Sequence, residues 1–159
     1  MDHVAWGALD PMRPSEPGLG IGRWVRLNGK PDTAEFSLTV VDDAQGRGVG
    51  TTLLAVLYLS ALSLDVRVLR GVVARSNDRM VHWMQRLGAT EVPDDDPDDG
   101  AISFDLAVSS DPDSLPDTAP ARALADAIRR VRAADAANRD TPARHGGRRG
   151  RRPGRRRRE

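Results

Sequence analysis

QGRGVG at Gln45–Gly50, followed by TTLLAVLYLSALSL at Thr51–Leu64, is the stretch that decides the fold class of this chain. Glycines in such a loop let the backbone approach a ligand closely and adopt positive φ angles. The segment after the loop is apolar almost all round, which predicts a helix buried on most sides. A helix start presents unpaired N–H groups with a partial positive charge. The loop therefore predicts an anion site suited to phosphate or pyrophosphate, where Arg47 adds a full charge.

Apolar and alternating segments on both sides of this loop predict the remaining elements. Three strands are expected before the loop, at Val4–Leu9, Leu19–Leu27 and Ala34–Val41. After the buried helix we expect a strand, a helix and a strand, at Val66–Ala74, Met80–Leu87 and Ala101–Val108. This order predicts an α/β fold with mixed strand pairing.

The charge of the chain is distributed unevenly. The 159 residues carry a formal net charge of +1, but residues 140–159 hold nine arginines and two acidic residues. This end has a charge of +7 and the preceding part about −6. Because it has almost no apolar residues, residues 139–159 are expected to form a disordered Arg-rich tail with weak nonspecific attraction to polyanions.

Composition also divides the chain and limits the kinds of chemistry open to it. We expect a domain at 1–108, an acidic Pro-rich linker at 109–120 and an amphipathic helix at 121–138. The chain has no cysteine, so disulfides, thiolate nucleophiles and zinc knuckles are excluded. No apolar run is long enough to span a bilayer and no signal sequence is evident, which predicts a cytoplasmic protein without a membrane partner.

The glycine loop differs from two common nucleotide-binding motifs. A Walker loop ends in Gly-Lys-Ser/Thr, whereas Gly50 is followed by Thr51-Thr52 without a lysine. A Rossmann fingerprint requires G-x-G-x-x-G, and the third glycine is missing here. From the loop alone, a tight strand-to-helix turn without a ligand remains an alternative.

The surroundings of the loop resemble one known family. QGRGVG matches the Q/R-x-x-G-x-G/A signature of GNAT (GCN5-related) N-acetyltransferases, and TVVDDAQ before it is similar to the fourth strand of that fold. The segment SNDRMVHWMQRLGA resembles the family's N-x-x-A…L-G-F region. The resemblance covers about Val4 to Val108. It implies a mixed, mostly antiparallel sheet flanked by helices.

The resemblance also implies which residues bind acetyl-CoA as cosubstrate. The loop and the start of the helix would hold the pyrophosphate, through Gln45, Gly46, Arg47, Gly48, Val49, Gly50 and Thr51. The main chain at Thr39, Val40 and Val41 would pair with the pantetheine arm, which requires a locally splayed sheet. Asn77 would hydrogen-bond the CoA, or it would only cap the next helix.

Glu35 is the candidate general base. Transfer of an acyl group from a thioester to an amine requires the amine to be neutral. Glu35 lies in an otherwise uncharged strand, and A-E-x-x-x-x-V resembles bacterial protein-acetylating GNATs, where a glutamate in this strand is the proposed base. The alternative is a carboxylate on a solvated strand face.

Two departures from the family concern the rest of the mechanism. The tyrosine that many GNATs place seven residues after the asparagine is Met84 here, whereas Tyr58 looks like core. The family's first strand and two helices are not found before Val4, so the chain resembles an N-terminally shortened form. His82 has no second ligand nearby, so no metal is expected.

The sequence predicts an N-acyltransferase that acts on a small amine or a protein lysine. It is also compatible with a homodimer. Two alternatives belong to another class. One is a CoA-binding pseudoenzyme or sensor, and the other is a nucleic-acid-associated protein that acts through the tail. The tail contains no interleaved aromatic residues of the kind that stack on single-stranded bases.

Overall fold

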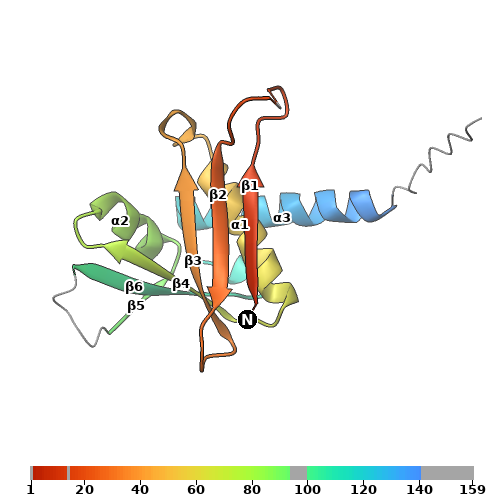
Figure 1. Ribbon diagram of the computed structural model, residues 1–159. Helices are drawn as coiled ribbons and strands as arrows, with labels where there is room; N and C mark the ends of the chain where they lie inside the picture. Colours follow the sequence, from red (N-terminus) through yellow and green to blue (C-terminus); the bar gives the residue numbers. More distant parts are fainter. Residues whose placement is uncertain (1, 14, 94–99, 141–159) are drawn as a thin grey trace, which may run out of the picture.

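The structure is a computed structural model that describes residues 2–13, 15–93 and 100–140. The acidic loop at 94–99 and residues 141–159 of the expected tail lie outside the described residues. A single six-stranded sheet forms the centre, with the order β1-β2-β3-β4-β6-β5 (Figure 1). Its strands are β1 (His3–Ala8), β2 (Gly20–Arg26), β3 (Thr33–Val40), β4 (Val68–Ala74), β5 (Thr90–Val92) and β6 (Ala101–Ala107).

One parallel pair interrupts the otherwise antiparallel sheet. β3 and β4 run parallel, but their pairing covers only Thr33–Phe36 against Val68–Gly71. Beyond this point β3 continues to Val40 and β4 to Ala74 without pairing to each other. The two strands therefore diverge after Phe36 and Gly71. We call this opening the fork.

The helices that touch the sheet pack on one face of it. α1 (Val49–Ser63) contacts β1, β2 and β3, and α2 (Asp78–Arg86) contacts β4 and β6. A Cβ added at Gly22 would meet Leu38 and α1, and one added at Gly71 would meet Phe36 and Met84 of α2. The register places both glycines on the face of Phe36 and Leu38.

The opposite face of the sheet carries none of the described helices. Figure 1 views β1 to β3 from this side, with α1 and α3 behind the strands. The exposed positions Glu35, Ser37 and Thr39 of β3 belong to this face, whereas Phe36 is buried on the helical side. We call it the open face.

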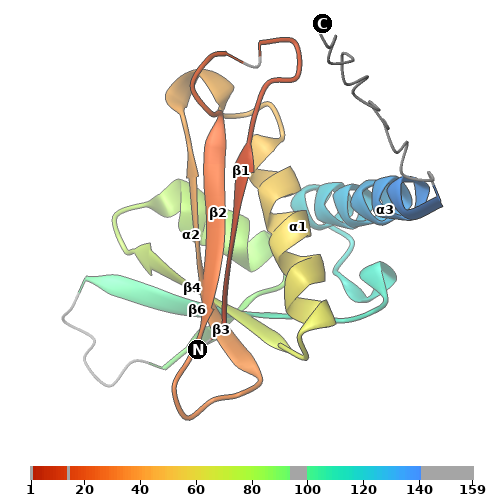
Figure 2. The same cartoon turned by 45° about the vertical axis from the view of Figure 1, so that its right-hand side comes forward.

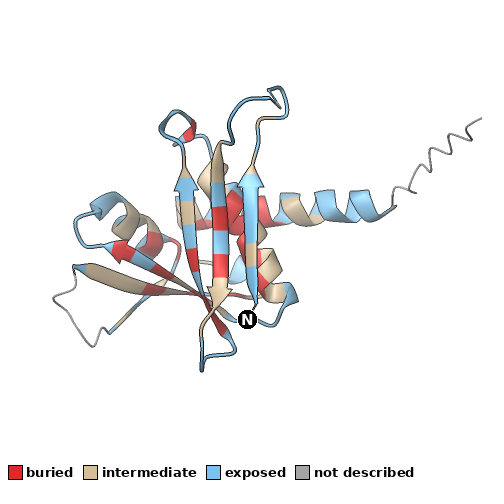
Figure 3. Cartoon of the chain, in the orientation of Figure 1, coloured by how far each residue is buried: buried red, intermediate tan, exposed pale blue. Residues whose placement is uncertain are grey.

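The third helix covers α1 and adds side chains to the core. α3 (Ala119–Asp140) packs across α1 and touches α2 (Figure 2). Its side chains Leu124, Ala127 and Ile128 join the core, whose other buried residues lie mainly along α1, β3, β4 and β6 (Figure 3). The core thus continues past Val108, where the domain expected from the sequence ends.

The described residues confirm the predicted α/β class with a mixed, mostly antiparallel sheet and flanking helices. The predicted alternation in β3 is present. In α1 only Thr52 and Ser63 are exposed, and its other residues are buried or partly buried, in line with its nearly uniform apolar sequence. Trp24 of β2 is fully buried and donates from Nε1 to Ser60 Oγ of α1 at 2.9 Å. β5 was not expected from the sequence.

Candidate functional site

A cleft of about 720 Å³ opens beside the glycine loop. It lies between the end of β3, the start of α1 and one side of α2, and Pro120 of α3 also borders it. Its lining contains much of the predicted set, namely Thr39, Val40, Gln45, Gly46, Gly48, Gly50, Thr51 and Asn77. The structure therefore brings together residues that are up to 38 positions apart in sequence.

The glycines of the loop have two different functions. Gly46 and Gly48 have φ angles of +72° and +83°, a backbone conformation that residues with a side chain rarely adopt. Gly50 lies inside α1, and a Cβ there would meet Val40 only at an ordinary contact of 3.6 Å. The fold thus requires glycine at the first two positions but not at Gly50, whose missing side chain leaves room in the cleft.

The start of α1 is open to a ligand. Gly48 is the N-cap and provides no side-chain hydrogen bond, and the first turn contains no acidic residue. The first backbone N–H groups of a helix have no partner within the helix, and they carry part of the positive end of its dipole. This end of α1 faces the cleft through Gly50 and Thr51.

The charged residues of the cleft lining are basic. Arg79 and Arg86 of α2 border it, and among the residues that the structure describes no aspartate or glutamate lines it. Arg47, expected to supply the positive charge, is exposed and does not line the cleft, and the same holds for Val41. The sequence analysis did not identify Arg79 or Arg86, because only the packing of α2 beside the loop brings them to the site.

Gln45 connects the loop to both neighbouring elements. Its Nε2 donates to Asp42 Oδ1 at 2.9 Å and to the Val40 carbonyl at 3.4 Å. Its Oε1 accepts from Arg79 Nη1 at 3.5 Å. Gln45 therefore positions the loop relative to β3 and α2.

The free edge of β3 faces the fork. Val41 N–H donates to Leu19 and the Thr33 carbonyl accepts from Leu27, so the main chain of odd-numbered residues points toward β2. Because successive residues of a strand alternate, the main chain of Leu38 and Val40 points the other way, into the fork. The splay that the sequence interpretation required is present. The main chain on this side belongs to Leu38 and Val40 rather than to Thr39 and Val41, and the Val40 carbonyl also accepts from Gln45 at 3.4 Å.

Asn77 is the N-cap of α2. Its Oδ1 accepts from the Met80 backbone N–H at 3.1 Å. Asn77 also borders the cleft, and the cap uses only its side-chain oxygen, which leaves the amide nitrogen as a donor. The capping function is thus present in the structure and does not exclude a contact with CoA.

Glu35 lies at the base of the fork on the open face. It is exposed and stands one residue before the last β3–β4 pair, directly opposite Arg70 of β4. Arg70 is held by Asp105 of β6, with Nε donating to Oδ1 at 2.7 Å and Nη2 to Oδ2 at 2.8 Å. This hydrogen bonding raises the pKa of Arg70 against the effect of desolvation, and the charges of Asp105 and Glu35 act in the same upward direction.

Two positions bear on the general acid that protonates the departing thiolate, namely Tyr58 and Met84, and both are buried in the core. Tyr58 is fully buried, and its hydroxyl accepts from the Ser109 backbone N–H at 2.7 Å. Burial raises the pKa of this phenol. Met84, at the position of the family's tyrosine, is buried in the core, whereas His82 is exposed and lines the cleft. The described residues contain no cluster of side chains suited to a metal ion.

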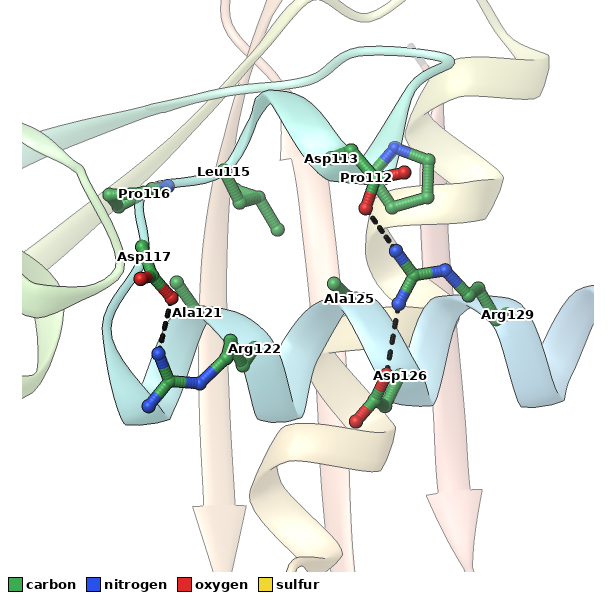
Figure 4. A pocket seen from close by; sticks show the side chains of 10 residues that line it. All are labelled: Pro112, Asp113, Leu115, Pro116, Asp117, Ala121, Arg122, Ala125, Asp126 and Arg129. Carbon is green, nitrogen blue, oxygen red and sulfur yellow. Dashed lines mark hydrogen bonds and ion pairs between the residues drawn. The ribbon is translucent and has the colours of Figure 1, made fainter.

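A second cleft, of about 340 Å³, lies between Pro112–Ser114 and α3 (Figure 4). Its charged residues are paired with one another. Arg129 binds Asp113 and also Asp126, the latter at 2.9 Å, and Arg122 binds Asp117. These pairs satisfy the charges on both sides, so this cleft is a poor site for an anion. Across the described ranges, no helix is both long and apolar enough to cross a membrane.

Comparisons with known proteins find similar acetyltransferases. No family profile matches the chain. A curated relative, "Acetyltransferase Pat" of Mycolicibacterium smegmatis, is 37% identical over 98 residues, which are 59% of this chain and 28% of that protein. The chain thus spans little more than a quarter of the length of this relative.

Solved structures of bacterial acyltransferases are also similar to the chain. The GNAT domain of S. lividans PAT has a TM-score of 0.58 at 25% identity, with coverage of 67% of this chain and 61% of that domain. The cAMP-binding acyltransferase from Mycobacterium smegmatis has a TM-score of 0.55 at 27% identity, over 80% of this chain and 40% of that protein. The chain thus has the GNAT fold and resembles, in sequence and structure, the GNAT domains of bacterial acetyltransferases.

Proposed function

We propose that the protein is an N-acyltransferase that transfers an acetyl group from acetyl-CoA to a primary amine of a small molecule or a protein lysine. The observation that carries this proposal is the cleft at the fork. It combines an uncapped helix start, two arginines and a free strand edge within one cavity. An acyl-CoA presents the complementary groups, because it has a pyrophosphate at one end and an extended amide-containing arm at the other.

In this proposal the parts of the cleft hold different parts of the cosubstrate. The amides of the loop and the first turn of α1 bind the pyrophosphate, and Arg79 adds charge beside them. The main chain of Leu38 and Val40 pairs with the pantetheine arm, which places the thioester near the fork. Glu35 then takes a proton from the acceptor amine, directly or through water, on the open face.

The direct test is calorimetric titration with acetyl-CoA, followed by a transfer assay on a panel of small amines and lysine peptides. Saturable binding with acetylation of at least one amine is expected. Binding without transfer to any acceptor would replace the enzyme by a CoA-binding sensor. Absence of binding would remove the acyltransferase assignment altogether.

A further inference from the structure

Two carboxylates flank one guanidinium on the open face. Strand register places Glu35 of β3, Arg70 of β4 and Asp105 of β6 in one row across three adjacent strands. Neighbouring strands lie about 4.8 Å apart, so both carboxylates are within reach of the Arg70 side chain. The row carries one guanidinium and two carboxylates, hence a net charge of −1 when all three are ionised.

Arg70 is engaged on one side only. Its two-point contact with Asp105 uses Nε and Nη2, and the two side chains are 17% and 27% exposed. Among the described residues, Glu35 forms no ion pair. Within the described strands, the other charged or titratable residues on this face near Glu35 are Arg23 of β2, which donates to Ser37 Oγ at 3.2 Å, and His3 of β1, two strands away.

We propose that Asp105 is a positioning residue for Glu35, because it holds Arg70 in a two-point pair and so prevents the guanidinium from pairing with the Glu35 carboxylate. A carboxylate paired with arginine is a weak base, because the neighbouring charge favours its ionised form. Asp105 would therefore keep Glu35 available to accept a proton at the base of the fork. This inference rests on the proposed function, in which Glu35 is the general base.

The first experiment follows the titration of Glu35 by carbon-13 NMR of its side-chain carboxyl in four proteins. These are the parent, Asp105→Asn, Arg70→Gln and the double variant. In Asp105→Asn the released Arg70 is expected to pair with Glu35 and move its titration midpoint down by about one pH unit. In the Arg70→Gln background, the same Asp105→Asn change should cause a much smaller shift.

The four proteins form a double-variant cycle. It distinguishes the effect of the Arg70–Asp105 pair on Glu35 from the effect of removing the Asp105 charge. If Asp105→Asn lowers the midpoint equally with and without Arg70, Asp105 acts by its own charge and the inference is wrong. Asp65→Asn is the matched control, since it removes an equal charge from the exposed Arg67–Asp65 pair and should leave the Glu35 midpoint unchanged. A comparable shift in this control would also contradict the inference.

Two further measurements test the inference separately from the NMR cycle, and the first needs neither a variant nor activity. In the parent, hydrogen exchange at Arg70 Nε should be slower than at the exposed Arg47, and equal rates would show that Asp105 does not hold Arg70. In transfer assays, the acidic limb of the pH profile should move to lower pH in Asp105→Asn and return in the double variant. If no variant transfers an acyl group, the proposed function fails, while the NMR cycle still tests the pairing of these three residues.

Discussion

Asn77 shows how one side chain can serve the fold and a ligand at the same time. Its oxygen caps α2, and the residue borders the cleft that most of the predicted binding residues line. A sequence pattern cannot separate these two functions, because an N-cap and a CoA contact both favour asparagine at a helix start. A substitution that changes one end of the amide can separate them.

Asn77→Asp keeps an oxygen acceptor for the cap but replaces the amide donors with a negative charge. Aspartate and asparagine are similarly good caps, so the free energy of unfolding should change by less than about 0.5 kcal/mol. Affinity for acetyl-CoA should fall at least roughly tenfold, since a donor is lost and the new charge repels a phosphate. Chemical denaturation and calorimetry measure the two effects. Unchanged affinity would show that Asn77 is a cap only.

Tyr58 is the only tyrosine of the chain, so its ionisation can be followed by phenolate absorbance. Burial raises the pKa of this phenol, with a smaller opposing effect from the Ser109 hydrogen bond. The midpoint in the folded protein should therefore lie above that of the unfolded chain. Because the unfolded chain then releases this proton first, stability from Tyr58 is complete below the usual pKa near 10 and is lost as pH rises through the folded value. Equal midpoints in folded and unfolded protein would contradict the burial.

At the scale of elements, the glycine loop and α1 act as one unit. The sequence was sufficient to predict this unit, because the glycines and the apolar helix are contiguous. The predicted strand pattern of β3 was also correct, but its free edge was not predictable, since which main-chain groups face the fork depends on pairing with β2. Three-residue β5 is too short to give a periodic signal.

Gly50→Leu tests whether the space at the start of α1 belongs to a ligand. A Cβ at this helical position meets Val40 only at an ordinary contact of 3.6 Å, and leucine favours a helix over glycine by about 1 kcal/mol, so stability should be equal or higher. Binding of acetyl-CoA should be abolished, because the new side chain projects into the cleft. Thr52→Leu places the same leucine side chain in the same turn, at an exposed position outside the cleft lining, and is the control. Parental affinity in Gly50→Leu would exclude the loop from the binding site.

At the scale of the whole molecule, contacts between residues far apart in sequence bring together side chains whose proximity could not be predicted from the sequence. Arg70 and Asp105 are 35 residues apart and meet only when β4 pairs with β6. Arg79 reaches the loop only because α2 packs beside it. The amphipathic stripe of α3 left open whether this helix docks on the domain or on a partner. In the structure its apolar side packs on α1, with Leu124 and Ile128 fully buried.

Leu124→Ala measures how far α3 contributes to the stability of the whole molecule. Removing this buried side chain should lower the free energy of unfolding by about 2–5 kcal/mol in a single cooperative transition. Arg130→Ala changes an exposed position on the same helix and should cost less than about 0.5 kcal/mol. Denaturation curves in urea compare the two variants. Similar small losses for both would show that α3 is not part of the cooperative core.

The central claim is that acetyl-CoA binds in the cleft and that Glu35, on the open face, is the general base. Comparing Glu35→Gln with the parent tests this claim most directly. Glutamine keeps the shape of the side chain but cannot accept the proton. Acetyl transfer should fall by roughly 10²- to 10⁴-fold while the affinity for acetyl-CoA, measured by calorimetry, stays near that of the parent. An active parent with a fully active Glu35→Gln variant would contradict the account, since the open-face carboxylate would then not be the base.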